Sequence, residues 1–249
     1  GAYPQRCQYY SLPVSREEME RSNLEYLITR KLSLGEYDID ALLERYRNCG
    51  APMDHMEEQF YVYASAMLLK GSDGEIEKMT ELLLEAILYT VPNFSAYCPK
   101  NCAFLSFMEI TIINHIADNY NCLGKSEEAK TMLLFLKEYL EYQEIDLEEK
   151  AKIYPMILLN LNSWLGMEGR NELAYELSNT GIDFCIRYGN LTPFPMLVFN
   201  KGCNLAKMNR LDEAIPFFRQ ACTIFEALKD RERAERCRKE VLAAFSVDI

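Results

Sequence analysis

Apolar residues recur every three to four positions along most of the chain, which is the period of an amphipathic α-helix. No stretch sustains the alternation of apolar and polar residues that marks a half-buried strand, and no Asn-Gly or Asp-Gly turn separates two β-branched runs. Glycine and proline residues divide the helical pattern into segments. The pattern therefore predicts an all-α protein with helices at 15–33, 38–49, 54–70, 74–90, 103–123, 126–143, 147–166, 170–188, 194–208, 211–228 and 230–245.

Most connections between these helices are short, so successive helices are expected to pack as antiparallel neighbours. The exception is the stretch VPNFSAYCPKN, which is long enough to hinge the first third of the chain against the rest. We expect an extended linker or tag remnant at 1–14, degenerate helical hairpins at 15–92, a loop at 93–102, and repeats with a C-terminal capping helix at 103–249.

Small residues recur at fixed intervals among the bulky residues of the C-terminal half. Gly202 is followed by Ala214 after twelve residues and by Ala221 after seven more. Helices that cross closely need small side chains where their backbones approach. The spacing therefore predicts a helical hairpin in which Gly202 lies close to Ala214.

The same interval occurs twice more. Asn162 precedes Ala174 by twelve residues, and Ala117 precedes Ala129 by twelve. Ala129, Ala174 and Ala214, the second residues of the three pairs, are 45 and 40 residues apart. These periods are longer than the roughly 34 residues of a minimal tetratricopeptide repeat. The pattern predicts a right-handed superhelix of antiparallel helical hairpins, a TPR-like solenoid whose helices are extended.

The charge of the chain argues against nucleic acid and anionic lipid as partners. The formal net charge is −11 and the isoelectric point is about 4.9, so nucleic acid and anionic lipid would repel the polypeptide as a whole. The basic run from Lys229 to Lys239 also carries three acidic residues and is interpreted as a solvated helix face. We expect no nucleic-acid contact by this segment and no membrane contact.

Other features place the chain in the cytoplasm. No apolar run reaches the roughly 18 residues of a membrane helix, and the N-terminal residues lack the apolar core of a signal peptide. The nine cysteines have no repeating frame, which is typical of reduced, packed thiols. Cys98 and Cys102 form the only close pair, and His55 and His115 stand alone, so no metal site is expected.

Motifs for catalysis are missing from the sequence. It contains no phosphate-binding loop, no dinucleotide fingerprint, no H-E-x-x-H and no G-x-S-x-G. Acidic pairs such as Glu127 with Glu128 fall at expected helix N-termini, where they complement the helix dipole. We therefore expect no enzyme activity, no catalytic residues and no cofactor.

The stretch FNKGCNLAKMNRLDEAIPFFRQAC resembles tetratricopeptide repeats, because it carries their Gly, Asp-Glu-Ala and later Ala in order. It departs from them at Val198, where an aromatic residue is usual. With the preceding stretch EKAKIYPMILLNLNSWLGMEGRNELAYELSNTG, it resembles the sensor region of Firmicute helix-turn-helix transcription regulators of the Rgg and PlcR group. The resemblance is good over 100–245 and loose over 15–90.

This resemblance implies a domain for quorum sensing. Such domains bind a short peptide in a concave groove, form homodimers, and pass the binding event to an N-terminal DNA-binding domain. We expect that domain to be absent from this chain, because nothing before Arg16 has the length and pattern of a helix-turn-helix.

The resemblance also implies where a ligand would bind, because the first helix of each hairpin lines the inner surface of such solenoids. Asn160 and Asn200 occupy equivalent places, and an amide can pair with both N–H and C=O of a peptide backbone. The alternative is that these asparagines join neighbouring helices. The candidate ligand-binding residues are Asn114, His115, Asp118, Asn121, Asn160, Ser163, Met167, Phe199, Asn200, Cys203 and Lys207.

Two other functions stay open at this point. The chain fits a constitutive scaffold that docks a folded protein or a protein tail, as many repeat domains do. It also fits a regulator like the aspartyl-phosphate phosphatases of the Rap group, in which a helical bundle at 15–90 would contact a response regulator. Phe60, Tyr61 and Tyr63 of this segment are interpreted as core residues rather than as a pocket floor.

Overall fold

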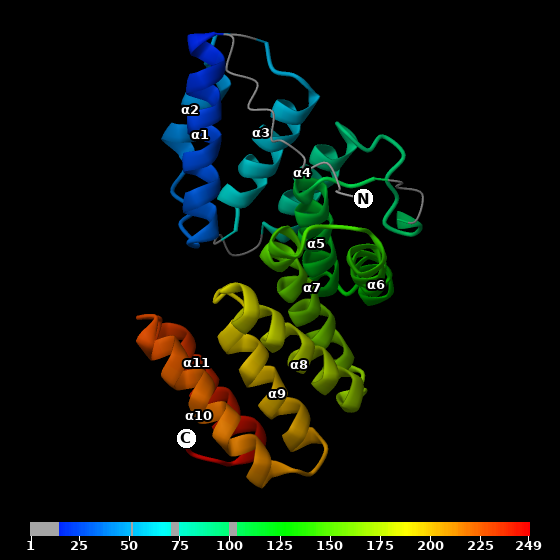
Figure 1. The fold of residues 1–249 in the computed structure, drawn as a ribbon, viewed down its shortest axis with the longest axis vertical. Coiled ribbons are helices and arrows are strands. Elements are labelled where there is room, and N and C mark those ends of the chain that lie inside the picture. The colour runs from blue at the N-terminus through cyan, green and yellow to red at the C-terminus, as the bar shows by residue number, and fades with distance from the viewer. Residues whose placement is uncertain (1–14, 51, 71–74, 100–103) are drawn as a thin grey trace, which may run out of the picture. The chain divides into compact units, whose positions relative to one another are not determined.

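The computed structural model describes residues 15–50, 52–70, 75–99 and 104–249 (Figure 1). Within these residues it contains eleven α-helices and no β-strand, which confirms the all-α prediction. The helices are α1 Arg16–Ser33, α2 Asp40–Arg47, α3 His55–Leu68, α4 Ile76–Leu88, α5 Phe107–Cys122, α6 Ser126–Tyr142, α7 Leu147–Met167, α8 Asn171–Tyr188, α9 Phe194–Lys207, α10 Leu211–Ala227 and α11 Arg231–Phe245. The expected linker at 1–14 and Cys102 lie outside the described residues.

Each predicted helix has a counterpart, and the largest difference is at the start of α5. The sequence predicted a start at residue 103, whereas the helix begins at Phe107. Ser106 caps it, because its hydroxyl accepts a hydrogen bond of 3.3 Å from the Glu109 amide while the Glu109 carboxylate accepts one from the Ser106 amide. Such a capping box stops the helix from extending towards the N-terminus.

The chain forms two compact units, Gly1–Lys125 and Ser126–Ile249, which are described separately. The N-terminal unit contains α1 to α5, and the C-terminal unit contains α6 to α11. The predicted hairpin with Ala117 and Ala129 has one helix in each unit, so it stays a prediction. The domain limits expected from the sequence also stay a prediction.

The N-terminal unit packs α1, α2 and α3 around a core that includes Leu24, Ile28, Tyr46 and Phe60. Phe60 and Tyr63 are buried, as the core interpretation expected, whereas Tyr61 is half-buried. A chain of polar contacts continues towards α5. In it, Gln59 donates to Thr90 at 2.6 Å and Thr90 donates to Glu109 at 2.6 Å.

One turn recurs through the C-terminal unit. Gly169, Asn209 and Lys229 each have a positive φ, between 60° and 76°, and each precedes the next helix by two residues. In each turn the following amide donates back into the preceding helix, as Arg210 does to the Leu205 carbonyl at 2.9 Å. Because the three turns have the same length and conformation, the two helices that each turn joins pair in the same register.

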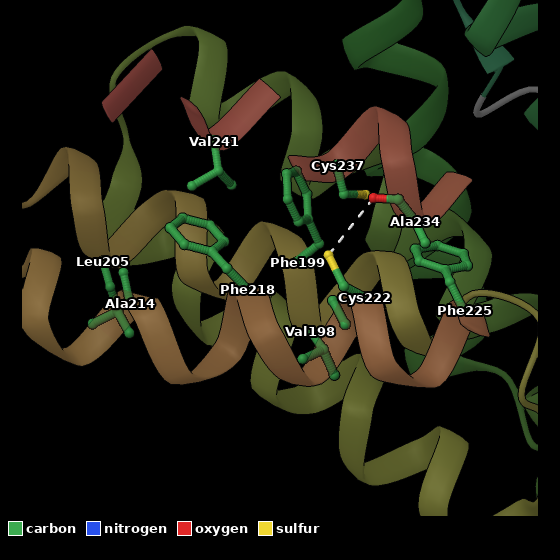
Figure 2. Packing of buried hydrophobic residues seen from close by; sticks show 11 residues of the cluster. Val198, Phe199, Leu205, Ala214, Phe218, Cys222, Phe225, Ala234, Cys237 and Val241 are labelled. Atoms are coloured by element: carbon green, nitrogen blue, oxygen red, sulfur yellow. Dashed lines mark hydrogen bonds between the residues drawn. The ribbon is translucent and has the colours of Figure 1, made fainter. Parts of the chain in front are cut away.

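This register explains the interval of twelve residues. A Cβ at Gly202 would lie 3.3 Å from the Ala214 carbonyl oxygen and 2.7 Å from the Phe218 ring, so the predicted close approach of Gly202 and Ala214 is confirmed. Asn162 fills the equivalent place in the α7–α8 hairpin and donates a hydrogen bond to the Ala174 carbonyl. A third pair continues the register, because the Cys222 thiol donates to the Ala234 carbonyl at 3.7 Å (Figure 2).

The apolar core around these contacts joins α9, α10 and α11 (Figure 2). Phe199 and Phe218 contact each other across α9 and α10, with ring centroids 5.5 Å apart. Val241 on α11 closes the cluster and is fully buried. The core thus holds α9 firmly from one side, and the polar residues of its opposite side are left for other contacts.

Candidate functional site

The candidate ligand-binding residues fall into two groups. Asn114, His115, Asp118 and Asn121 belong to α5 in the N-terminal unit. The other seven belong to α7 and α9 in the C-terminal unit. Each group is therefore a separate candidate surface.

On α5, His115 is half-buried beside Tyr63, with ring centroids 6.0 Å apart. Burial, and to a smaller extent the positive charge of Lys70, lower the pKa of His115 to about 3. The imidazole is therefore neutral near pH 7 and can donate and accept one hydrogen bond each. Asp118 is exposed and Asn121 is half-buried.

The expectation that Asn114 lies on an exposed face is corrected by the structure. Only 4% of Asn114 is exposed, because it shares the buried face of α5 with Ile110 and Ala117. The same correction applies to Phe199, which is 1% exposed and packs on Phe218 (Figure 2). Consecutive helical residues point about 100° apart, so Phe199 enters the core while Asn200 does not.

Three polar contacts join α7 to α9, and we call this set of contacts the α7/α9 seam. Asn200 Nδ2 donates to Ser163 Oγ at 3.1 Å, Asn204 Nδ2 donates to Asn162 Oδ1 at 3.5 Å, and Lys207 Nζ donates to the Gly166 carbonyl at 2.9 Å. The α9 residues are spaced by four and three positions, so they form one stripe along the helix. The seam runs from the surface at Asn200, through the interior at Asn204, to the surface at Lys207.

Gly166 allows the seam to close. It is buried, and a Cβ at this position would lie 3.1 Å from Asn204 Oδ1 and 3.7 Å from Lys207 Nζ. A side chain would therefore crowd the Asn204 amide, whereas its distance from Lys207 is an ordinary van der Waals contact. The glycine leaves room beside α7 for the buried amide of Asn204.

Asn200 has hydrogen-bonding capacity beyond the seam. Its contact with Ser163 matches the alternative that these asparagines join neighbouring helices. An amide side chain offers two N–H groups and an oxygen, and this contact uses one N–H group. Asn160, its equivalent on α7, is half-buried.

Met167 supplies the less polar part of this surface, whereas Cys203 packs partly against the core of α9, α10 and α11. Cys203 lies on α9 between Asn200 and Lys207, and it is half-buried. Burial is the main cause that raises the pKa of its thiol to about 12, and Glu240 adds to this rise while Lys207 opposes it. The thiol is therefore uncharged at neutral pH. Met167, on α7, is 63% exposed.

Sequence reasoning missed the buried half of the seam. Asn162, Asn204 and Gly166 were not candidates, although Asn162 was part of the repeat pattern. Asn204 follows Asn200 by four residues, and this helical spacing of two amides was the available signal. Both buried amides have hydrogen-bond partners, so their role in the structure is to fix the helices.

Ser163, Met167 and Lys207 of the candidate surface on α7 and α9 are exposed. Two hollows in the C-terminal unit have volumes of about 450 and 210 Å³, and none of the candidate residues lines either of them. Among the described residues, no group of three or more His, Cys, Asp and Glu side chains could hold a metal ion. None of the described helices is both long enough and apolar enough to cross a membrane.

Comparison with known proteins relates the fold to solved structures. No protein-family model matches the chain, and no curated protein does. Bacillus thuringiensis PlcR in complex with the peptide PapR7 and DNA is similar, with a TM-score of 0.69 and 16% identity over 92% of this chain and 77% of that chain. The apo form of that protein gives a TM-score of 0.61 and 16% identity, over 91% and 78% of the two chains.

A second kind of structure also matches. The TPR-like repeats of a kinesin light chain from Podosopora anserina have a TM-score of 0.52 and 14% identity, over 84% of this chain and 96% of that chain. At these identities the similarity concerns the fold. The predicted TPR-like helical-repeat fold is thereby confirmed.

Proposed function

We propose that this chain is the peptide-sensing part of a transcription regulator. The observation that carries the proposal is the stripe of exposed and half-buried polar groups at Ser163, Asn200 and Lys207, on a fold similar to that of a peptide-bound regulator. An open stripe suits an extended ligand, because main-chain N–H and C=O groups of a peptide need partners at regular intervals. Met167, which is 63% exposed and lies one helical turn after Ser163, provides an adaptable apolar contact beside it.

The signal in this proposal is a shift between arrangements of the repeats. A peptide changes the arrangement only if it binds one state more tightly than the other, with a coupling of about 1–3 kcal/mol. The regulator would carry this change from a cytoplasmic homodimer to DNA-binding domains outside this chain. The similar PlcR structure contains both a peptide and DNA, which supports a regulator of this kind.

Peptide titration tests the proposal. We would measure binding of a library of short synthetic peptides by isothermal titration and by the fluorescence of Trp164, which neighbours Ser163 and is buried. We expect saturable binding by one group of related peptides, and weaker binding after Asn200→Ala with an unchanged circular dichroism spectrum. Asn23→Ala, at an exposed position of α1, is the matched control and should bind as the wild type does.

The competing functions give different results in related assays. If a pulldown from lysate recovered a stable folded partner and no peptide bound, the scaffold function would be favoured. Dephosphorylation of a phosphorylated response regulator would favour a Rap-like function. Either result would overturn the peptide-sensing proposal.

A further inference from the structure

Lys207 carries spare hydrogen-bonding capacity on the candidate surface. Its ammonium donates to the Gly166 carbonyl at 2.9 Å, and an ammonium has three donors. In the described part of the chain, Lys207 forms no ion pair within 4.0 Å, unlike Lys130, Lys137 and Lys152 of the same unit. Lys207 therefore presents a positive charge that this unit does not neutralise by direct contact.

The seam fixes where that charge lies. The C-terminal carbonyls of a helix lack intrahelical partners, and the Gly166 carbonyl near the end of α7 takes its hydrogen bond from Lys207. Ser163 likewise holds one N–H group of Asn200. Both α9 side chains are thus oriented by α7 before any ligand arrives, which lowers the entropy that binding has to overcome.

The two groups are spaced for an extended peptide. Asn200 and Lys207 are seven residues apart on one helix, which corresponds to about 10 Å along its axis. An extended chain covers about 3.3 Å per residue, so about three peptide residues span this distance. Cys203 lies between them in the sequence and packs partly against the core of α9, α10 and α11.

We propose that the ligand of the α7/α9 seam is a peptide with a carboxylate about three residues from the backbone amide that Asn200 binds. The proposal rests on the peptide-sensing function proposed above. Lys207 pairs with the carboxylate, and Asn200 pairs with the amide through its second N–H group and its Oδ1 atom. Ser163 and the Gly166 carbonyl are positioning groups that keep these two contacts at a set distance.

The carboxylate has two sources, the C-terminus of the peptide and an Asp or Glu side chain. The chemistry at Lys207 is the same for both, because an ammonium acts as a point charge towards either. The test therefore compares each bound library peptide with its C-terminal amide and with its Asn or Gln analogue. Each change removes one source of negative charge.

Lys207→Gln is the variant that isolates the charge. Glutamine retains an N–H donor for the Gly166 carbonyl but has no positive charge. We expect the peptide with the carboxylate to bind about fivefold more weakly to this variant, since an exposed ion pair is worth up to about that factor. The neutral analogue should bind equally to the wild type and to Lys207→Gln. The control variant is Lys239→Gln, at an exposed position of α11, which should leave the binding of every peptide unchanged.

The outcomes separate this inference from the proposed function. Weaker binding after C-terminal amidation, or after the Asp or Glu change, supports the inference and identifies the source of the charge. If peptides bind to the wild type and neither change nor Lys207→Gln alters affinity, the inference is overturned while the proposed function stands. If the wild type binds no peptide, both are overturned.

Discussion

Asn204 donates a long hydrogen bond of 3.5 Å to Asn162, inside the C-terminal unit, where these residues are 2% and 1% exposed. Asn162 in turn donates to Ser178 Oγ at 2.6 Å and to the Ala174 carbonyl. Three helices are therefore joined by one buried polar network. Such networks stabilise when complete, because an unpaired polar group in the interior is costly.

Asn162→Leu should destabilise the C-terminal unit. The substitution conserves volume approximately but leaves Asn204, Ser178 and the Ala174 carbonyl without their partner. We expect the free energy of unfolding to fall by about 2–3 kcal/mol, which is the cost of buried unsatisfied groups. Urea denaturation followed by circular dichroism measures it, and Ser163→Ala at the exposed end of the seam is the control. A change below about 0.5 kcal/mol would show that the network contributes little.

Gly202→Ala should also destabilise, although alanine is the better helix former. The added Cβ would lie 2.7 Å from the Phe218 ring, so α9 or the ring has to move. Overpacking costs about 1–3 kcal/mol, which exceeds the gain in helix propensity of about 1 kcal/mol. Phe218→Leu should recover part of the loss when combined with Gly202→Ala. Additive effects in this double-mutant cycle would argue against the clash.

His115 should make stability depend on pH below neutrality. Its pKa in the folded state is about 3, which is below the ordinary value for histidine, so the unfolded state binds a proton first as the pH falls. The stabilising contribution of the neutral imidazole is therefore complete above about pH 6.5 and is lost progressively down to about pH 3. His115→Gln should flatten the dependence of the free energy of unfolding in this window.

The second histidine of the chain is the control for this measurement. His55 is exposed at the start of α3, so His55→Gln should retain the pH dependence of the wild type. If both variants lost the pH dependence of the free energy of unfolding equally, this dependence could not be assigned to His115.

Cys203 should react slowly with a disulfide reagent at pH 7.5. Its pKa is raised to about 12 by burial, so the reactive thiolate is scarce. Cys98 is exposed and should be modified first. Mass spectrometry of the labelled protein over time measures both rates. Labelling of Cys203 as fast as that of Cys98 would show that its thiol is not shielded.

Local patterns in the sequence determined the helices and their register. Helical period and the glycine and proline residues between helices act within a few residues, so they located every helix that the structure describes. The interval between Gly202 and Ala214 is set by one turn and by the helical rise, and it therefore predicted a contact across two helices. The start of α5 at Phe107 was missed, because the capping box at Ser106 was not used as a signal.

Only the tertiary structure decided which side chains reach the surface. Asn114 and Phe199 carry the same helical pattern as exposed candidates, but neighbouring helices bury them. The pairing of Asn200 with Ser163, and of Lys207 with the Gly166 carbonyl, depends on how α7 lies beside α9. A sequence pattern shows that a helix has an apolar face, whereas the packing of its neighbours determines where that face ends and which polar groups are left for a ligand.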